Sequence, residues 1–281
     1  NKVAKIFGKK FGLMVNSGSS ANLLGLASFE FKKDSEIITP ALTFSTTVAP
    51  IYQLGYIPCF IDVERNSYIA NIKQIEKCIN SKTVAIMIPN LLGNVPDWIE
   101  IHKIAKKYNL KVIEDSADTL GAKINNKSTG IYSDISITSF YGSHVISCAG
   151  NGGIFLTNDK NYFTRAKVLR SWGRMSTLIK DSENINKRLG IKLKGFDYDR
   201  KFVFSEAGYN FEPSEIGASF GLEQLKKFNF FTKIRNRNFK IHYDFSYTHN
   251  YYGADHQSGD NHGICFIFPY LLWYNFCKYY E

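Results

Sequence analysis

The stretch Lys111-Val112-Ile113-Glu114-Asp115-Ser116-Ala117-Asp118-Thr119-Leu120-Gly121 decides the fold class of this chain. It begins as a short apolar run with β-branched residues and continues into small and acidic residues, a pattern typical of a buried strand followed by a turn. Asp115 would then end a strand at the edge where open α/β sheets bind their ligands. The alternative interpretation of Asp115 is the N-cap of a short helix over residues 116–120.

Similar apolar runs recur on both sides of this stretch, and we interpret them as parallel strands. They cover residues 37–40, 57–63, 83–89 and 135–140. Apolar residues at helical spacing fall between them, at 72–79 and 99–108, and residues 16–26 suit a helix that follows a Gly/Ser turn. This alternation predicts an α/β fold, with a mostly parallel sheet flanked by helices on both faces.

Length and composition fit a soluble, cytoplasmic protein with a sizeable core, since the chain has 281 residues of which 44% are hydrophobic. We find no uncharged apolar run of about 18 residues, so we expect no membrane partner, and the first residues lack a signal-peptide pattern. The net charge is +10, but the 35 Lys and Arg are spread along the chain, so we expect no nucleic-acid partner. Part of the excess would suit an anionic substrate such as a nucleotide diphosphate.

The five cysteines form neither a C-x-x-C pair nor a zinc-ligand spacing. We therefore expect no metal site, and we expect most of the thiols to be buried in a reducing compartment.

The segment Asn16-Ser17-Gly18-Ser19-Ser20-Ala21-Asn22 places Gly18 and Ser19 where a turn leads into a helix. Backbone N–H groups and a hydroxyl at such a helix start can bind a phosphate. Taken alone, the segment fits an ordinary helix cap even better.

A third stretch, Ser139-Phe140-Tyr141-Gly142-Ser143-His144-Val145-Ile146, completes a pattern with the two quoted above. In order and spacing, the three resemble the pyridoxal-phosphate site of the DegT/DnrJ/EryC1/StrS sugar aminotransferase family. The resemblance covers nearly the whole chain. It implies the PLP-dependent transferase fold (aspartate aminotransferase, fold type I), with a small C-terminal domain that is truncated here.

His144 stands where members of this family carry the lysine that binds the cofactor covalently. A histidine cannot form that bond, but its imidazole can still move a proton. The change is similar to that in the nucleotide-sugar 3-dehydratase branch, and it makes His144 the candidate catalytic base.

The resemblance also implies roles for other residues around the cofactor. Asp115 would keep the pyridinium nitrogen protonated, and Asp118 would face the 3'-oxygen. Phe44 would stack on the ring, although a core phenylalanine is nearly as good an interpretation of it. Ser139, with Gly18 and Ser19, would bind the phosphate. Asn210 would reach the phosphate of a neighbouring subunit's cofactor, which implies a homodimer.

The motifs at residues 170–174, 195–199 and 208–211 are most similar to dehydratases that make 3-deoxy sugars from nucleotide-linked 4-keto-6-deoxyhexoses. The CDP-sugar enzyme of this branch carries an iron–sulfur cluster on cysteines, but this chain has Ser116, Ala117 and residues 175–178 (Met-Ser-Thr-Leu) at those places. We therefore expect no cluster, as in the GDP-sugar enzyme. The sequence around residues 170–225 is nevertheless more like the CDP type, so both nucleotides stay open.

The resemblance thus implies a pyridoxamine 5'-phosphate-dependent C3 dehydration in deoxysugar and lipopolysaccharide O-antigen biosynthesis, with a nucleotide-diphosphate sugar and glutamate as substrates. One alternative is a PLP-dependent sugar aminotransferase, but the nearest lysines, Lys123 and Lys127, lie in a different segment. Another alternative is a truncated relative without catalytic activity.

For the domain organisation, we expect a large cofactor-binding domain over residues 1–228, with an exposed substrate or dimer loop at 170–209. Within it, residues 3–11 resemble the end of a clipped helix, and 213–228 have helical spacing. Residues 229–281 would begin the small C-terminal domain, with a first strand at 264–269.

Overall fold

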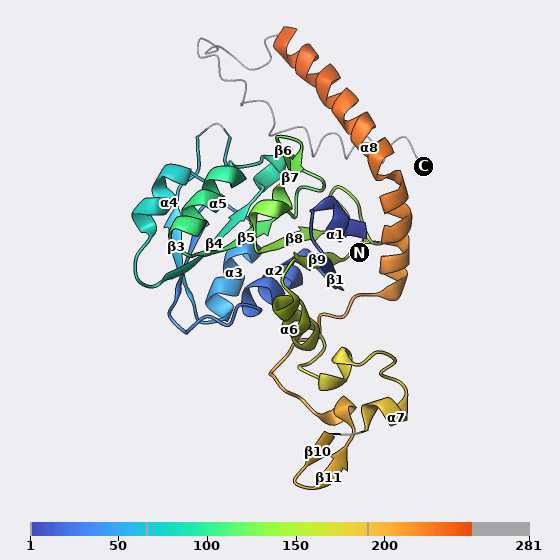
Figure 1. The fold of residues 1–281 in the computed structure, drawn as a ribbon. Coiled ribbons are helices and arrows are strands. Elements are labelled where there is room, and N and C mark those ends of the chain that lie inside the picture. Colours follow the sequence, from blue (N-terminus) through green and yellow to red (C-terminus); the bar gives the residue numbers. More distant parts are fainter. Residues whose placement is uncertain (1, 66, 190, 249–281) are drawn as a thin grey trace.

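The computed structural model describes residues 2–65, 67–189 and 191–248, and a central sheet organises this part of the chain (Figure 1). Seven strands of the described residues form it, in the order β1-β9-β8-β5-β4-β2-β3. Their bounds are β1 Phe11–Val15, β2 Glu36–Pro40, β3 Ile57–Ile61, β4 Thr83–Pro89, β5 Lys111–Asp115, β8 Ile135–Ser139 and β9 Gly153–Thr157. A small hairpin, β6 (Lys123–Ile124) with β7 (Lys127–Ser128), lies outside the sheet.

The predicted parallel strands are confirmed, because β8, β5, β4, β2 and β3 pair with one another in parallel. At the other end of the sheet, β9 runs antiparallel to both β8 and β1. The expected helix at residues 3–11 is shorter than predicted. Helix α1 covers Lys2–Ile6, and Phe11 already begins β1.

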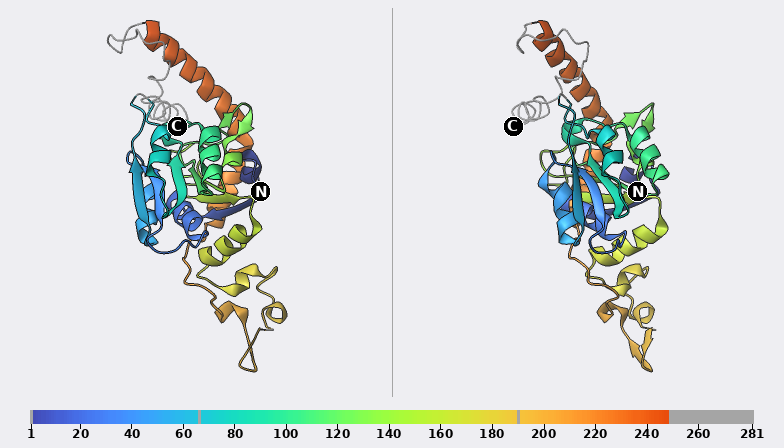
Figure 2. Two further views of the ribbon diagram at one scale, coloured as in Figure 1. Left: turned by 60° about the vertical axis from the view of Figure 1, so that its left-hand side comes forward. Right: turned by 90° about the vertical axis from the view of Figure 1, so that its left-hand side faces the viewer.

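Helices cover both faces of the sheet (Figures 1 and 2). Helices α2 (Gly18–Ala27), α3 (Ser45–Gln53) and α6 (Lys160–Arg170) lie on one face, where Ile113 of β5 joins their core. Helices α4 (Ile72–Cys78) and α5 (Trp98–Lys107) lie on the other, with Val112. Since neighbouring strand residues point to opposite faces, the mainly apolar strands can contribute side chains to both layers.

The last two residues of β5 are acidic, and their side chains point to opposite faces of the sheet. Glu114 is fully buried on the α5 face, where its oxygens accept hydrogen bonds from Asn90, Ser116 and Ser136 at 2.7 to 3.1 Å. Asp115 is 4% exposed on the α2 and α3 face. The two neighbouring acids therefore belong to different layers.

Residues 171–209, which we call the arm, project from the body in all three views (Figures 1 and 2). They contain the hairpin β10 (Ile191–Leu193) with β11 (Phe196–Tyr198), helix α7 (Ile185–Arg188), and the short helices η3 (Met175–Leu178) and η4 (Arg200–Phe202). Phe196 is 72% exposed and Phe202 is 73% exposed. The segment is exposed as predicted; its role toward a substrate or a second subunit stays a prediction.

Helix α8 (Glu215–Thr248) packs against the body with its first half and extends away from the arm (Figure 1). It runs through residue 228, where we expected a domain boundary, so a helix rather than a loop occupies that position. The division into two domains stays a prediction, because residues 249–281, including the expected strand at 264–269, lie outside the described residues. No helix of the described chain has the length and hydrophobicity required to cross a membrane.

Candidate active site

The predicted site residues gather where the parallel strands end. Asp115 is the last residue of β5, and Ser139 is the last residue of β8. Gly18 opens α2, and Phe44 is the N-cap of α3. The carboxyl ends of parallel strands meet the amino ends of the following helices at one edge of a sheet, which is where open α/β folds bind ligands. We call this edge the candidate site.

The turn into α2 leaves backbone N–H groups without an acceptor within the helix. The side chain of Ser17 accepts a 3.0 Å hydrogen bond from the N–H of Ser20, so Ser17 is the cap. The N–H groups of Gly18 and Ser19 therefore lie in the first turn, where a helix has no acceptor of its own for them. A Cβ on Gly18 would lie 2.6 Å from the Cβ of Ser139, so only glycine allows this approach. The cap and the phosphate interpretations are thus compatible.

Asp115 lies at the centre of a buried polar cluster. One carboxylate oxygen accepts hydrogen bonds from Asn22 Nδ2 at 2.8 Å and from Thr47 Oγ1 at 2.7 Å, and the other accepts from the N–H of Ala117 at 3.1 Å. Burial raises the pKa of Asp115, with the hydrogen bonds from Thr47 and Asn22 opposing the shift. A cation beside this carboxylate, such as a protonated ring nitrogen, would lower the pKa again. Residues 116–120 form a turn and no helix, so the N-cap alternative for Asp115 was wrong.

His144 and Asp118 approach each other across the site. The Nε2 atom of His144 lies 3.6 Å from Oδ1 of Asp118, and the other oxygen of Asp118 accepts a 2.8 Å hydrogen bond from the N–H of Leu92. The Nδ1 atom of His144 is buried without a hydrogen-bond partner. Burial lowers the pKa of His144, while the charges of Asp118 and Asp115 oppose that shift. The imidazole is therefore mainly uncharged at neutral pH, with one ring nitrogen directed away from Asp118.

Helix α8 braces the loop that carries His144. Arg235 donates a 2.7 Å hydrogen bond from Nη2 to the carbonyl of Val145. A Cβ on Gly221 would lie 2.3 Å from the sulfur of Cys148, so glycine is needed for the helix to pack this closely. These contacts link a helix from the end of the described chain to the site.

The aromatic ring of Phe44 is 68% exposed, so the alternative of a core phenylalanine was wrong. An exposed ring beside the carboxyl end of the sheet leaves one face available for stacking on a planar group.

Asn210 lies at the root of the arm and is exposed. It forms a bridge with Ser171, and the carbonyl of the next residue, Phe211, accepts a 3.1 Å hydrogen bond from the N–H of Asn16. The arm is thus fastened directly before the α2 turn. The action of Asn210 on a second subunit stays a prediction.

The residues that hold the site in place were not identified from the sequence. Asn22 lies in the quoted segment 16–22 and Thr47 lies three residues after Phe44, but their bonds to Asp115 span 93 and 68 residues of sequence. Asn90 and Leu92, in the turn after β4, were not among the predicted site residues. A polar residue at the carboxyl end of a predicted parallel strand could have identified Asn90.

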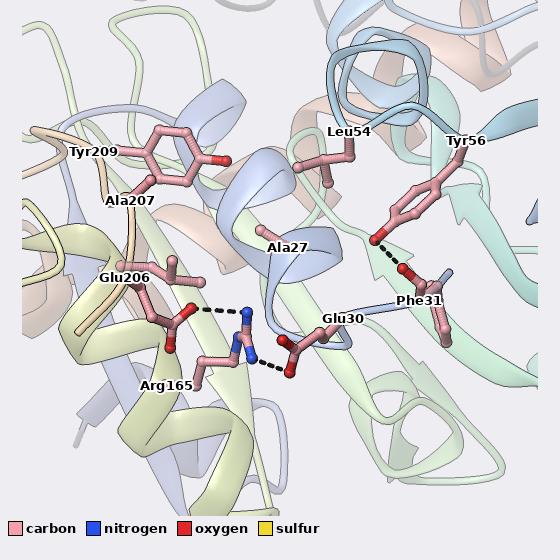
Figure 3. Close-up of a pocket in the computed structure, with 10 residues that line it drawn as sticks. Ala27, Glu30, Phe31, Leu54, Tyr56, Arg165, Glu206, Ala207 and Tyr209 are labelled. Carbon is pink, nitrogen blue, oxygen red and sulfur yellow. Dashed lines mark hydrogen bonds and ion pairs between the residues drawn. The ribbon is translucent and has the colours of Figure 1, made fainter. Parts of the chain in front are cut away.

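A separate pocket lies at the other end of α2 and α3 (Figure 3). It has a volume of about 350 Å³ and includes Ala27, the last residue of α2, and Leu54, which follows α3. Arg165 forms ion pairs there with Glu30 and Glu206 (Figure 3). Since α2 has ten residues, this pocket is about 14 Å from the candidate site.

No group of His, Cys, Asp and Glu in the described part of the chain could hold a metal ion. Among the three described cysteines, Cys148 is buried, whereas Cys59 and Cys78 are only partly buried. The expectation of mostly buried thiols therefore does not hold for these three.

Comparison with protein families agrees with the predicted resemblance. Residues 1–247 match the model of the DegT/DnrJ/EryC1/StrS aminotransferase family. GDP-4-keto-6-deoxy-D-mannose 3-dehydratase of Escherichia coli O55:H7 (strain CB9615 / EPEC) is 34% identical over 272 residues, covering 94% of this chain and 68% of that protein. dTDP-4-dehydro-2,6-dideoxy-D-glucose 3-dehydratase of Saccharopolyspora spinosa is 36% identical over 253 residues, covering 85% of this chain and 54% of that protein.

Solved structures confirm the predicted fold class. E. coli GDP-4-keto-6-deoxy-D-mannose-3-dehydratase with bound hydrated PLP matches with a TM-score of 0.78 and 34% identity, over 88% of this chain and 64% of that one. A mutant of GDP-4-keto-6-deoxymannose-3-dehydratase (ColD) with bound GDP-perosamine matches with a TM-score of 0.75 and 34% identity, over 84% of this chain and 61% of that one. This chain therefore spans 54% to 68% of the length of the proteins in these four matches.

Proposed function

Because this chain belongs to the DegT/DnrJ/EryC1/StrS aminotransferase family, we propose that it is a nucleotide-sugar 3-dehydratase, a lyase that depends on pyridoxal or pyridoxamine 5'-phosphate. Its substrate would be a nucleotide-linked 4-keto-6-deoxyhexose, which loses the C3 hydroxyl, and glutamate would restore the amine form of the cofactor. This places the chain in deoxysugar and lipopolysaccharide biosynthesis. The observation that carries the proposal concerns His144, in the loop after β8. Its imidazole lies 3.6 Å from the carboxylate of Asp118.

The residues at the sheet edge fit the cofactor. The close approach of Gly18 to Ser139 brings the first N–H groups of α2 beside a hydroxyl, and such a group of donors suits a phosphate. The buried carboxylate of Asp115 suits a cationic ring nitrogen, and the exposed ring of Phe44 suits a planar ring. When bound, the cofactor supplies a ring that accepts electrons from the substrate carbon skeleton.

His144 would accept and return the proton. With Nε2 directed at Asp118, the hydrogen of the neutral imidazole is best placed on Nε2, which leaves the lone pair of the unpartnered Nδ1 to accept a proton. His144 would thus move a proton at its own ring nitrogen, while the bound cofactor would supply the electron-accepting ring. The lowered pKa of His144 keeps the base uncharged before this step.

Relatives support both the base and the co-substrate. Two of the similar ColD structures have a replaced histidine, and in one of them the serine directly before it is replaced as well. In this chain Ser143 directly precedes His144. GDP-4-keto-6-deoxymannose-3-dehydratase was also solved with a trapped PLP-glutamate adduct, which supports glutamate as the amino donor here.

The positions of the lysines argue against an aminotransferase. Residues 139–151, which contain His144, include no lysine. Lys123 and Lys127 are exposed on the β6–β7 hairpin. Lys9 is buried, but its amine donates to the carbonyls of Ser133 and Asp134, at the start of β8 and not at its end.

The proposal includes a homodimer that shares its sites through Asn210. The proposal specifies a nucleotide-linked sugar without choosing the base, since the relatives are named for GDP and dTDP sugars. The absence of an iron–sulfur cluster also stays a prediction, tested by iron analysis of anaerobically purified protein.

A spectrum combined with a product assay tests the function. Purified protein would be given pyridoxamine phosphate, glutamate and GDP-, CDP- or dTDP-linked 4-keto-6-deoxyhexose. We expect the cofactor to absorb in the near-ultraviolet, and we expect a sugar product that is lighter by one oxygen atom. A product with an amino group in place of the keto oxygen would instead identify an aminotransferase. Neither change, with any of the three nucleotides, would indicate a relative without activity.

A further inference from the structure

Asn90 follows β4 directly and is the centre of a buried hydrogen-bond cluster. It is 1% exposed, and its amide nitrogen lies 2.7 Å from the Oγ of Ser116 and 3.1 Å from the Oγ1 of Thr119. The same nitrogen lies 3.1 Å from Oε1 of Glu114, and its amide oxygen accepts a 2.8 Å hydrogen bond from the indole of Trp98. An amide has two hydrogens, so the three acceptors share them.

These contacts connect two loops that follow neighbouring parallel strands. The backbone N–H of Asn90 donates to the carbonyl of Asp115 at 2.8 Å, and its carbonyl accepts from the N–H of Gly93 at 3.2 Å. Asn90 thus fixes the turn 90–94, which follows β4, to the loop 116–119, which follows β5. Its two contacts on that loop, Ser116 and Thr119, lie on either side of Asp118.

The turn 90–94 also binds Asp118 directly. Leu92 has a left-handed backbone, with φ of 55°, and donates its N–H to one oxygen of Asp118. The other oxygen faces His144. Asn90 therefore anchors both the turn that binds Asp118 and the loop that contains Asp118.

We propose that Asn90 is a positioning residue for proton transfer: its buried amide holds Asp118 against the imidazole of His144. Asp118 then orients the ring and fixes the hydrogen on the nitrogen that faces it. The proposal rests on the proposed function in that His144 is the base. It concerns a residue outside the cofactor motifs, which touches neither His144 nor the expected cofactor position.

The physical basis is that a buried polar cluster becomes unstable when one of its members is removed and the others lose their hydrogen-bond partners. Without the amide of Asn90, Ser116 and Thr119 lose a donor, and Glu114 and Trp98 lose a partner, in a site closed to water. The loop 116–119 would then keep other contacts, such as the 2.7 Å hydrogen bond from Thr138 to the carbonyl of Ser116. We therefore expect displacement of Asp118 and not unfolding of the loop.

The test measures the protonation of His144 by nuclear magnetic resonance, with histidine labelled at the carbon between its ring nitrogens. The full chain would be titrated, every variant in the same cofactor state, and the His144 signal identified by its loss in His144→Asn. Asp118→Asn should lower the pKa of His144 by about one unit, since a nearby negative charge is removed. Asn90→Leu should lower it in the same direction, and the double variant should add little to either single one.

A control and a milder variant separate positioning from general destabilisation. Thr157→Val also removes a hydrogen bond of a buried side chain, donated to the carbonyl of Asp134 at 3.0 Å, but this bond lies at the start of β8 and its loss should leave the pKa of His144 unchanged. If Asn90→Leu does not fold, Thr119→Val removes one contact of the Asn90 cluster with little change of volume, and should give a smaller shift of the same sign.

The proposal is overturned if folded Asn90→Leu or Thr119→Val leaves the pKa of His144 at the wild-type value, or if the shifts of Asn90→Leu and Asp118→Asn add fully. Failure of the proposed function is a different result, since the titration does not depend on which reaction the enzyme catalyses. With an active enzyme, Asn90→Leu should lower kcat about tenfold while KM for the sugar changes less than about twofold.

Discussion

The candidate site and the arm are held together in opposite ways. At the site, Asp115 and Asn90 are almost completely buried and hydrogen-bonded to segments far away in the sequence. In the arm, large apolar side chains such as Phe196 and Phe202 are more than two thirds exposed, and local ion pairs such as Arg188 with Asp199 connect its segments. Exposed apolar surface of this kind is typical of a region that binds another molecule. The hydrogen bonds of the candidate site are thus already formed within one chain. The arm, by contrast, carries apolar side chains that are largely exposed in the single chain.

The two regions meet at the root of the arm. Arg170 donates to the carbonyl of Met14 at 3.0 Å and forms an ion pair with Glu212 at 3.2 Å. Met14 lies in β1, only a few residues before the α2 turn. A second subunit bound to the arm would therefore act close to the cofactor phosphate, which is where we expect Asn210 to contribute.

The largest effect on activity is expected from His144→Asn, which removes the proposed base from the candidate site. Turnover should fall by about two to four orders of magnitude, the usual contribution of a general base. Cofactor binding and melting temperature should stay close to those of the wild type. Near-normal turnover would remove the assignment of His144.

The pH profile sharpens this prediction. Burial places the pKa of His144 below its ordinary value of 6.5, so the active neutral form should persist to lower pH than for an exposed histidine. The unfolded chain binds this proton more readily, so the same group lowers stability as the pH falls from 6.5 through the folded pKa. In wild type, kcat/KM should fall about tenfold per unit below that pKa, and this acid limb should be absent in His144→Asn.

A smaller loss is expected from Asp115→Asn. The amide has nearly the same shape but carries no charge to stabilise a protonated ring nitrogen, so activity should fall by about tenfold to a hundredfold. A cofactor-bound crystal structure with Asp115 directed away from the ring nitrogen would contradict this role.

The arm side of the comparison is tested by mixing two inactive variants. His144→Asn and Asn210→Asp subunits, combined under conditions that allow exchange, should recover about a quarter of wild-type activity, since half of random dimers contain one intact site. The carboxylate introduced by Asn210→Asp would also repel the phosphate and weaken cofactor binding in the single variant. A monomer that binds cofactor normally would rule out shared sites.

The smallest effect on stability is expected from Phe202→Ser in the arm. Because this ring is 73% exposed, the free energy of unfolding of the single chain should change by less than about 0.5 kcal/mol. If the arm lies in the dimer interface, sedimentation should nevertheless show weaker association. Phe155→Ser, in a fully buried strand position, is the matched control and should destabilise the fold itself.

The parallel half of the sheet could be predicted because its strands are continuous apolar runs separated by helical patterns. Strand β1 could not, since residues 11–15 follow a short helix closely and look like its continuation. The antiparallel direction of β9 depends on the reversal between residues 140 and 152, which no local pattern encodes.

For the site, motif spacing identified residues but could not identify their supports. Gly18, Asp115 and Ser139 stand at element ends, where the order of strands and helices brings them together. Asn90, by contrast, acts through bonds to residues 24 to 29 positions later. Such partners follow from strand order and side-chain direction, which become visible only in the assembled fold.

The back-to-back carboxylates of β5 also determine how this chain would respond to random mutation. Replacing Glu114 leaves buried donors of three side chains without an acceptor, so such variants should be lost at the level of protein abundance. Asp115→Asn keeps an amide oxygen that can accept from Asn22 and Thr47 but loses the charge, so this variant should be lost only under selection for the sugar product. A growth screen would find both adjacent positions intolerant. A parallel measurement of protein abundance would show that Glu114 is needed for a stable protein and Asp115 for its activity.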